Sequence, residues 1–482
     1  MIELTVPVRQ LAEFCHRRGD IDYRFTPSPT GEQGIAGHQA VYKRRGSSYQ
    51  PEYALETTFE YPDLELSVRG RADGYDVEQQ LLEEIKTCRV DPAFLPESAA
   101  AVHWAQAKLY GALLMQEQPD LTSLCLQLTW FNIDSEEEHG EQSDFSRAEL
   151  LEFLEATLEY YLKWLRGRQE WKLQRDASIH SLKFPFADFR SGQRDLAEVV
   201  YKCVASAGQL LLQAPTGIGK TAAVIYPALK AIAARKHDTI SFVTSRTVGR
   251  RAAEDSLAMM SKAGLKLRSL SLTAKDTVCF SPGKACHGDD CDFAKGYYDR
   301  LPDALAGAMQ VQALNRAGVE ALAREYTVCP YQLAMDLVPW VDMSIGDVHY
   351  VFSYHASLSG HFQASEQRWS VLLDEAHNLP GRARKMFSAQ LRKSDVIAVR
   401  RASTGSVKRA LDRCNRECLA LQNLDWNEPE FHIETELPDK LLFALQSLVS
   451  AISELQVKNP AYVQQNPQLM DLFFNVLQCL RV

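Results

Sequence analysis

The feature that most constrains this chain is residues 214–221, which read Ala-Pro-Thr-Gly-Ile-Gly-Lys-Thr and follow the apolar run Leu210–Leu212. We expect a short buried strand, a glycine-containing turn and then a helix, because such a turn points several backbone N–H groups at one place, where a triphosphate can sit. Alanine stands where the strict pattern has glycine, so an ordinary strand–turn–helix corner is the alternative. The expected nucleotide ligands are Thr216, Gly217, Gly219, Lys220 at the β- and γ-phosphates, and Thr221 on Mg²⁺.

A second motif favours the nucleotide interpretation. Residues 369–377 read Trp-Ser-Val-Leu-Leu-Asp-Glu-Ala-His, which predicts an apolar strand that ends in two carboxylates. Asp374 would bind Mg²⁺ through its water shell, and Glu375 would orient and deprotonate the attacking water. His377 would couple the nucleotide state to the nucleic-acid side. A capped helix start can also read Asp-Glu, but the loop upstream makes this alternative weaker, and the two motifs together predict an NTPase.

Length and composition set the frame for these motifs. A chain of 482 residues is expected to hold about three domains of ~150 residues each. The N-terminus carries charge early and lacks a signal-peptide core, and no later run approaches a membrane span, so we expect a cytoplasmic protein. A formal charge of −9 disfavours indiscriminate polyanion binding, although local basic tracts can still bind DNA.

The first 175 residues alternate between helical and extended patterns. We expect helices at residues 7–18 and 99–116, and strands at residues 55–61, 64–75, 81–87 and 123–133. The acidic tract 134–141 is predicted to be a solvated loop. A long amphipathic helix is expected over 148–174, followed by a linker at 176–188.

Three polar residues fall together on the predicted strands. Asp73 ends one strand, and Glu84 and Lys86 lie two apart on the next, so period-two geometry places Glu84 and Lys86 on the same face. A hairpin would bring Asp73 beside them. Two carboxylates can hold Mg²⁺ or Mn²⁺, and an adjacent ammonium can stabilise developing charge and position a water. This combination predicts metal-assisted phosphodiester hydrolysis.

These residues resemble the core of the PD-(D/E)xK nucleases, with Gly70-Arg-Ala-Asp73-Gly followed by Glu84-Ile-Lys86. Gly37-His38 resembles the additional histidine ligand of the RecB-like branch, and Gln106-Ala-Lys-Leu-Tyr110 resembles its Gln-x-x-x-Tyr motif. Gln106 and Tyr110 are four apart on a predicted helix, so they face one way, toward DNA or the lysine. No cysteine set here resembles the iron–sulfur staple of some RecB-like nucleases.

Two polar elements flank the phosphate-binding loop. Gln193 precedes the loop at a distance that suits an adenine-reading residue, since its amide can both donate to and accept from a base edge, and it favours ATP over GTP. A strand over 238–244 is expected to end at Thr244-Ser-Arg-Thr247, where hydroxyls and arginines suit a DNA backbone. The alternative for this second element is a strand end followed by an arginine-rich helix start.

Four of the eleven cysteines lie inside about fifty residues, while the other seven are spread over the rest of the chain. Zinc modules usually supply ligands in C-x-x-C pairs, and none is present in this group. Four thiolates at wider gaps suit an iron–sulfur cluster better. The expected ligands are Cys279, Cys286, Cys291 and Cys329.

The position of these cysteines, between the phosphate-binding loop and the acidic motif, resembles the XPD/DinG helicases, which carry a [4Fe-4S] domain in this interval. Cys329-Pro-Tyr and the stretch Asp347-Val-His-Tyr-Val-Phe-Ser353 match further. The gap between the first two cysteines is shorter than the commonest family spacing. The resemblance implies ATP-driven movement on single-stranded DNA, typically 5′ to 3′, with the cluster domain near the point of strand separation.

The last hundred residues are helical and begin with a basic tract. Residues 382–416 hold eleven Lys or Arg against two Asp, a composition that can track phosphates or can simply form solvated helix faces. The following residues resemble the start of the family's arch insertion. No element of a second motor lobe follows Asp374, so we expect either a fragment or a naturally shortened form that binds ATP weakly and hydrolyses it poorly.

The sequence therefore predicts an α/β protein with a PD-(D/E)xK nuclease domain and a RecA-like parallel-sheet motor lobe that carries an iron–sulfur insertion and part of a helical arch. It would process DNA, single-stranded, flapped or forked, using ATP and Mg²⁺ or Mn²⁺. The alternatives are a nuclease-like domain that only binds DNA, and a non-catalytic module that presents the cluster. The expected domains are 1–175 (nuclease), 189–272 and 336–385 (motor lobe), 273–335 (cluster insertion) and 386–482 (partial arch).

Overall fold

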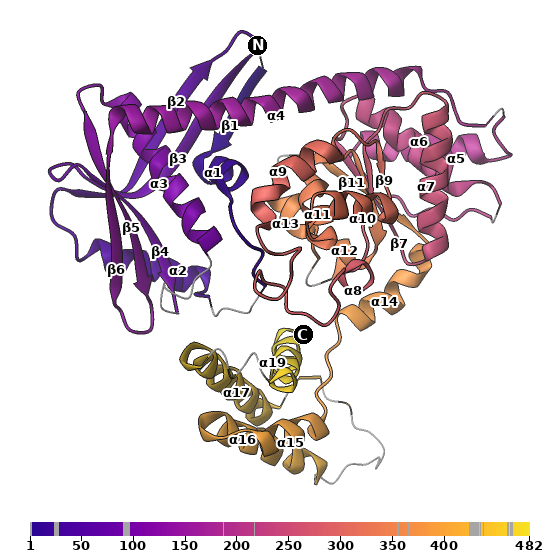
Figure 1. Ribbon diagram of the computed structural model, residues 1–482. Helices are drawn as coiled ribbons and strands as arrows, with labels where there is room; N and C mark the ends of the chain where they lie inside the picture. Colours follow the sequence, from indigo (N-terminus) through magenta and orange to yellow (C-terminus); the bar gives the residue numbers. More distant parts are fainter. Residues whose placement is uncertain are drawn as a thin grey trace.

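The computed structural model describes residues 2–23, 28–89, 97–186, 188–215, 217–353, 356–364, 367–423, 433, 435–436, 438–459, 462 and 466–482. Two bodies that each contain a sheet lie side by side under one long helix, and a separate group of helices forms the lower part of the molecule (Figure 1). None of the described helices is long and apolar enough to cross a bilayer.

The N-terminal body is built on a six-stranded mixed sheet of order β1-β3-β4-β5-β6, with β2 paired to β3. Its central pairs β1–β3 and β4–β5 are parallel, and the others are antiparallel. The strands are β1 (Ile2–Pro7), β2 (Tyr49–Glu60), β3 (Leu64–Asp76), β4 (Leu81–Cys88), β5 (Ser123–Asn132) and β6 (Glu138–Ser146). The helices are α1 (Val8–His16), α2 (Gly31–Tyr42) and α3 (Glu97–Glu117).

Alternation explains why β3 forms a strand with one face in the core. Leu64, Leu66 and Val68 are buried, and they pack with side chains of α1 and α3. The four strands and two helices expected from the sequence are all present. The sequence did not predict β1 or α2. The loop expected over 134–141 is confirmed for residues 134–137 and wrong for residues 138–141, because β6 begins at Glu138 and pairs with β5.

Helix α4 (Arg147–Ser181) joins the two bodies without a break. It begins with a capping box in which Ser146 and Glu149 exchange hydrogen bonds with each other's backbone N–H groups. It ends on the second body, where Ile179 lies in the core beside Ile225 and Leu229. The expected linker at 176–188 is therefore wrong in its first six residues, which continue the helix, and Figure 1 shows α4 running over both bodies.

A buried polar contact fixes α4 to the second body. Asp342 is only 5% exposed, and its carboxylate accepts hydrogen bonds from the Arg175 guanidinium at 2.7 Å and the Trp171 indole N–H at 2.8 Å. The backbone N–H of Arg268 donates to the same carboxylate at 2.9 Å. A charge buried this deeply is tolerated because it is paired and fully hydrogen-bonded.

The second body is a parallel five-stranded sheet of order β11-β7-β10-β8-β9, covered by helices. Its strands are β7 (Thr239–Thr244), β8 (Ser269–Ser271), β9 (Ala313–Leu314), β10 (Met343–Asp347) and β11 (Trp369–Asp374). The helices around the sheet are α5 (Gln193–Ala205), α6 (Lys220–Ala233), α7 (Thr247–Lys262), α12 (His349–Phe352), α13 (Ser359–Ala364) and α14 (Leu379–Met386). The cysteine region contributes α8 (Lys275–Val278), α9 (Tyr297–Ala308), α10 (Arg316–Glu325) and α11 (Pro330–Leu337).

The stretch before the phosphate-binding loop differs from the expectation. Leu210, Leu211 and Leu212 form no strand, and Leu211 is 90% exposed. Within the described residues the sheet ends at β11, and the apolar run does not pair with the free edge of that strand. The predicted buried strand at this position is therefore wrong.

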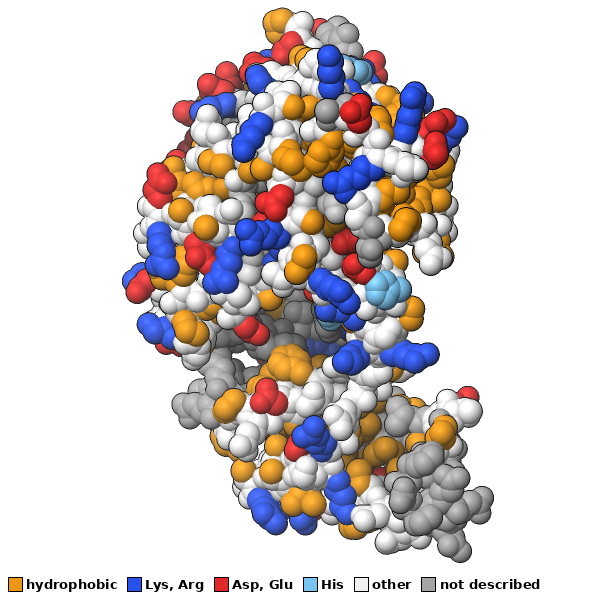
Figure 2. Space-filling model, turned by 90° about the vertical axis from the view of Figure 1, so that its right-hand side faces the viewer, with side chains coloured by type: hydrophobic (Ala, Val, Ile, Leu, Met, Phe, Trp, Pro, Cys, Tyr) orange, Lys and Arg blue, Asp and Glu red, His pale blue; other side chains and the backbone are white. Residues whose placement is uncertain are grey.

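The C-terminal helices form a small core of their own. They are α15 (Lys393–Ala402), α16 (Gly405–Gln422), α17 (Asp439–Lys458) and α19 (Pro467–Arg481), and their buried faces share one apolar cluster. Figure 2 shows Lys and Arg side chains on both sides of the hollow between this part and the rest of the molecule.

Removing the Asp342 carboxylate should detach α4 from the second body. Asp342→Ala removes the acceptor of Trp171 and of the Arg268 N–H and leaves the buried Arg175 guanidinium with the pair to Asp176, which should lower the free energy of unfolding by about 3 kcal/mol. Urea denaturation followed by circular dichroism measures this loss. Asp63→Ala is the matched control, because it breaks an exposed ion pair with Arg166 on the same helix. An equal effect of both substitutions would contradict the anchoring role of Asp342.

Candidate functional sites

Strand pairing places the first two predicted nuclease residues side by side. Gly74 on β3 pairs with Glu83 on β4, so Asp73 lies next to Glu84. The backbone N–H of Ile85 donates to Asp73 Oδ2 at 2.6 Å, and Lys86 Nζ lies 2.5 Å from Glu84 Oε1. Burial raises the pKa of the Glu84 carboxyl, Lys86 lowers it and the nearby Asp73 raises it, with a net rise.

Helix α2 brings His38 to the same carboxylates. Its Nδ1 atom lies 3.3 Å from Asp73 Oδ1. The helix can approach β4 this closely because residue 37 is glycine, where a Cβ would lie 2.5 Å from the Thr87 methyl group. Gly37 therefore allows α2 to lie close enough to β4 for His38 to reach Asp73.

Helix α3 closes the site from the other side. Gln106 and Tyr110 are both buried, and the Tyr110 ring packs against Gly70, where a Cβ would lie 2.7 Å from it. Burial raises the pKa of the Tyr110 hydroxyl, and the negative charges of Glu84 and Asp73 add to the rise. The structure thus brings together all six residues predicted for the nuclease site: His38, Asp73, Glu84, Lys86, Gln106 and Tyr110.

His103 belongs to this site and was missed. It lies one turn before Gln106 on α3, its pKa is lowered to about 4 by burial first and then by Lys86, and a hydrogen bond to Gln106 opposes this shift. Its i−3 spacing from Gln106 is the signal that the sequence offered. A neutral imidazole at this position can exchange a proton or hydrogen-bond without adding charge.

The donor set fits a hard divalent cation in its chemistry. Two carboxylates and one imidazole converge, and a cation between Asp73 and Glu84 would offset the burial and the Asp73 charge that raise the Glu84 pKa. As the side chains stand, Lys86 pairs with Glu84, and no three His, Cys, Asp or Glu side chains within the described residues have the spacing to ligate one metal ion directly.

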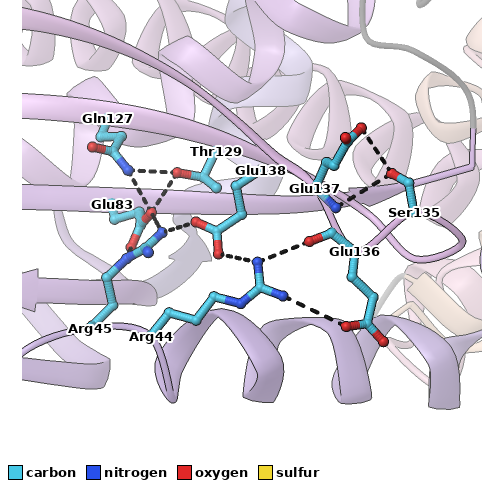
Figure 3. Close-up of polar contacts among 9 residues, drawn as sticks. All are labelled: Arg44, Arg45, Glu83, Gln127, Thr129, Ser135, Glu136, Glu137 and Glu138. Carbon is cyan, nitrogen blue, oxygen red and sulfur yellow. Dashed lines mark hydrogen bonds and ion pairs between the residues drawn. The ribbon is translucent and has the colours of Figure 1, made fainter.

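On the opposite face of β4, Glu83 anchors a second polar network (Figure 3). This carboxylate is fully buried and pairs with Arg45 at 2.6 Å, while Gln127 and Thr129 donate to it at 2.7 and 2.5 Å. Arg45 also pairs with Glu138 of β6 at 2.7 Å. Because Arg45 follows α2 directly, this network holds the His38 helix against the strand that carries Glu84.

The phosphate-binding loop of the second body opens helix α6 at Lys220. Gly217 and Gly219 have positive φ values of 83° and 79°, which glycine adopts without strain. Lys220 Nζ donates to Ala214 O at 3.2 Å, across the loop. Thr216 lies outside the described residues. Gln193 is 1% exposed and donates to Gly219 O at 3.3 Å, so here it braces the loop.

The acidic motif lies beside this loop. Asp374 ends β11 next to Thr244 of β7, and burial first and then Glu375 raise the pKa of its carboxyl, while Lys220 and Thr244 lower it. Glu375 has a left-handed backbone with φ of 54°, an uncommon conformation for a residue other than glycine. His377 Nδ1 lies 3.3 Å from Glu375 Oε2. Lys220, Asp374 and Glu375 are thus neighbours in one site.

An ion pair that the sequence did not indicate connects three segments near this site. Arg382 of α14 pairs with Asp347 at the end of β10 at 3.1 Å, and it donates to Ser245 O at 2.7 Å. His349 also contacts Asp347, and its hydrogen bond helps to lower the pKa of that carboxyl against the effect of burial. This contact links the segment after β7 to the helix that follows the acidic motif.

All four predicted cluster ligands line one cavity: Cys279, Cys286, Cys291 and Cys329. Lys275 lies at the same cavity, and although burial alone would lower its pKa, a hydrogen bond to Cys286 raises it overall. Burial raises the pKa of Cys329, and the neighbouring Cys286 and Cys291 add to the rise. Four thiols around one cavity with an adjacent ammonium fit an iron–sulfur cluster, which is wider than a single ion.

Family models of helicases match residues of the second body. Residues 193–290 match the DEAD/DEAH box helicase family, and residues 258–396 match the DEAD_2 family. A regulator of telomere elongation helicase 1 homolog from Anopheles gambiae is 22% identical, over 48% of this chain and 28% of its own length. The chain thus spans less than a third of that relative.

Two solved structures are similar over part of the chain. An XPD helicase aligns at 13% identity and a TM-score of 0.36, covering 61% of this chain and 52% of its own. A truncated XPD aligns at 15% identity and a TM-score of 0.35, covering 55% and 76%. The two family matches overlap and lie almost wholly in the second body, and we use motor lobe as a label for this body, which holds the phosphate-binding loop and the acidic motif.

The Glu84 carboxylate of the N-terminal site should lower the stability of the folded protein at high pH. Because its folded pKa is raised, Glu84 favours the folded state while protonated, and this contribution is lost as pH rises through the folded pKa. Glu84→Gln has no such loss, so without divalent cations it should melt at a higher temperature than wild type at about pH 8 and not at about pH 5. Differential scanning fluorimetry measures this, and a pH-independent difference would contradict it.

Proposed function

We propose that this chain is a DNA-processing enzyme in which a metal-dependent nuclease site in the N-terminal body works with an ATP-dependent DNA helicase motor. The observation that carries the nuclease half is the convergence of Asp73, Glu84, Lys86 and His38 from three separate elements. Residues that only solvate a surface have no reason to converge on a buried carboxylate, and Glu84 is 2% exposed. The motor half rests on the family matches and on the neighbouring Lys220 and Asp374.

In the nuclease site, Asp73, Glu84 and His38 would hold Mg²⁺ or Mn²⁺. When bound, the cation supplies Lewis-acid stabilisation of charge on the scissile phosphate. Lys86 is then free from Glu84 to orient a water and to face the developing negative charge. Tyr110 and Gln106 support the carboxylates from α3, and their burial keeps bulk water away from that side.

In the motor lobe, Lys220 and Thr221 would bind the phosphates and Mg²⁺ of ATP, with Asp374 on the metal and Glu375 toward the attacking water. Gln193 would read adenine from a position where it already braces the loop. Basic side chains of the segment 382–416 offer contacts for a DNA backbone. Movement along single-stranded DNA in the 5′ to 3′ direction is the polarity that the XPD/DinG resemblance implies.

The cysteine cavity would hold a [4Fe-4S] cluster. Its four thiols and the adjacent Lys275 suit a group that carries negative charge through its thiolate ligands. The four cysteines lie between β8 and β10 in sequence, so a cluster there would stabilise an insertion whose helices are short.

One contact, the ion pair between Lys86 and Glu84, favours a second candidate function, DNA binding without cleavage. Lys86 Nζ pairs with Glu84, and this internal ion pair is what a nuclease-like domain that only binds DNA would show. In that case the site would recognise phosphates through Lys86 without cutting. Cleavage assays separate the two functions.

Glu84→Ala should abolish DNA cleavage while leaving the motor intact. We expect cleavage of end-labelled single-stranded DNA in Mn²⁺ without ATP to fall about 100-fold or more, as for loss of a group that holds the metal. Glu78→Ala, an exposed substitution in the turn before β4, is the control. Lys220→Ala should weaken ATP binding and leave cleavage unchanged. DNA binding without cleavage by wild type would favour the DNA-binding function.

Cys286→Ser should remove the iron–sulfur cluster. The purified wild type should be brown and contain iron and sulfide, and the variant should lose both the visible absorbance and the iron, since a serine hydroxyl does not replace a thiolate ligand. Cys203→Ser on α5 is the matched control. A colourless wild type that contains zinc would contradict the cluster.

A further inference from the structure

A segment of the N-terminal body lies across the cysteine region. Residues 17–23, which we call the strap, follow α1 directly and pair by backbone hydrogen bonds with the segments around the cavity. Tyr298 N–H donates to Gly19 O at 2.9 Å, Ile21 N–H donates to Ala294 O at 2.9 Å, and Tyr23 N–H donates to Cys286 O at 2.8 Å. The last of these bonds reaches a predicted cluster ligand.

Side chains of the strap add to this docking. Asp20 Oδ1 accepts from the Gly296 N–H at 2.6 Å, and the Arg17 guanidinium lies 4.0 Å from the centroid of the Tyr298 ring. Gly288, between Cys286 and Cys291, leaves room for the strap, because a Cβ there would lie 1.6 Å from Asp20 Oδ2. The cysteine loop and the strap are therefore shaped to each other.

Two strap residues form part of the cavity itself. Ile21 is 1% exposed, packs in the core of the cysteine region and lines the cavity, although it belongs to the N-terminal body in sequence. Tyr23 also lines the cavity, its ring lies 5.1 Å from Lys275 Nζ, and its hydroxyl bonds to Gln332. Because Ile21 is buried and Tyr23 is 48% exposed, these two side chains lie between the cavity and solvent on this side.

We propose that the strap is a wall of the cysteine cavity, supplied by the nuclease domain, which limits the access of water, oxygen and thiol reagents to the four cysteines. Its structural part rests on the described contacts alone, and its iron–sulfur part rests on the proposed cluster. Docking and cavity filling are then linked: if the docked strap stabilises a group in the cavity, that group stabilises docking by the same free energy. The cluster would thereby help to hold the nuclease domain against the motor lobe.

The first test needs no cluster. In iron-free protein, alkylation of Cys279, Cys286, Cys291 and Cys329 by iodoacetamide is followed by peptide mass spectrometry. In Ile21→Ala/Tyr23→Ala these four cysteines should react about tenfold faster than in wild type, which corresponds to about 1.4 kcal/mol of lost docking. Cys203 on α5 is the internal control and should react at an unchanged rate.

Gly288→Ala tests the same wall from the cysteine side, because its Cβ displaces Asp20 and should also raise the four rates. Leu173→Ala, an exposed substitution on α4, should change nothing. Unchanged alkylation rates of the four cysteines in both Ile21→Ala/Tyr23→Ala and Gly288→Ala would overturn the proposal. Faster alkylation of Cys203 as well would indicate general unfolding and would also overturn it.

The second test uses the cluster-loaded protein and two readouts apart from activity. On exposure to air the strap variants should lose their visible absorbance faster than wild type. Trypsin cleavage after Arg17 and Arg18 should be slower in loaded than in iron-free wild type, because the cluster holds the strap in place. If wild type takes up no cluster, the proposed cluster fails, while the alkylation result still decides the strap. Equal bleaching and equal cleavage would overturn the linkage.

Discussion

The buried ion pair between Arg175 and Asp342 is the contact on which the arrangement of the molecule depends. It fixes one continuous helix to the motor lobe, while the other end of that helix forms part of the core of the N-terminal body. Around it, Trp171 donates to the same carboxylate, and Trp340 packs against Phe14 and Trp164. The buried ion pair fixes where α4 contacts the motor lobe, and the aromatic side chains bury apolar surface around this contact.

The same physical problem, charge held away from water, explains the candidate nuclease site. Glu83 and Glu84 are neighbours on β4 and point to opposite faces, and both are buried. Glu83 is satisfied by Arg45, Gln127 and Thr129. Burial and the Asp73 charge raise the pKa of Glu84 by more than Lys86 and His38 lower it, so the negative charge of this carboxylate is incompletely compensated. A divalent cation would complete the compensation of the Glu84 charge. We therefore infer a structural role for Glu83 and a metal-binding role for Glu84.

Local patterns predicted the parts of the molecule that local physics determines. Alternation located β3 and β4, and an i, i+4 spacing placed Gln106 and Tyr110 on one face of α3. Partners distant in sequence decided the rest. The acidic β6 is a strand because β5 offers it an edge, and the last turns of α4 are helical because the motor lobe packs against them. Leu210–Leu212 are exposed and belong to no described strand. The strap contacts residues about 270 positions away, which no periodicity reveals.

The central claim is that the N-terminal body holds a divalent cation between Asp73 and Glu84. Electron paramagnetic resonance of Mn²⁺ titrated into nucleotide-free protein tests it most directly, because bound Mn²⁺ loses the sharp signal of the free ion. We expect wild type and Lys220→Ala to bind Mn²⁺ equally and Asp73→Asn to lose this site. Equal Mn²⁺ binding by Asp73→Asn and wild type would contradict it.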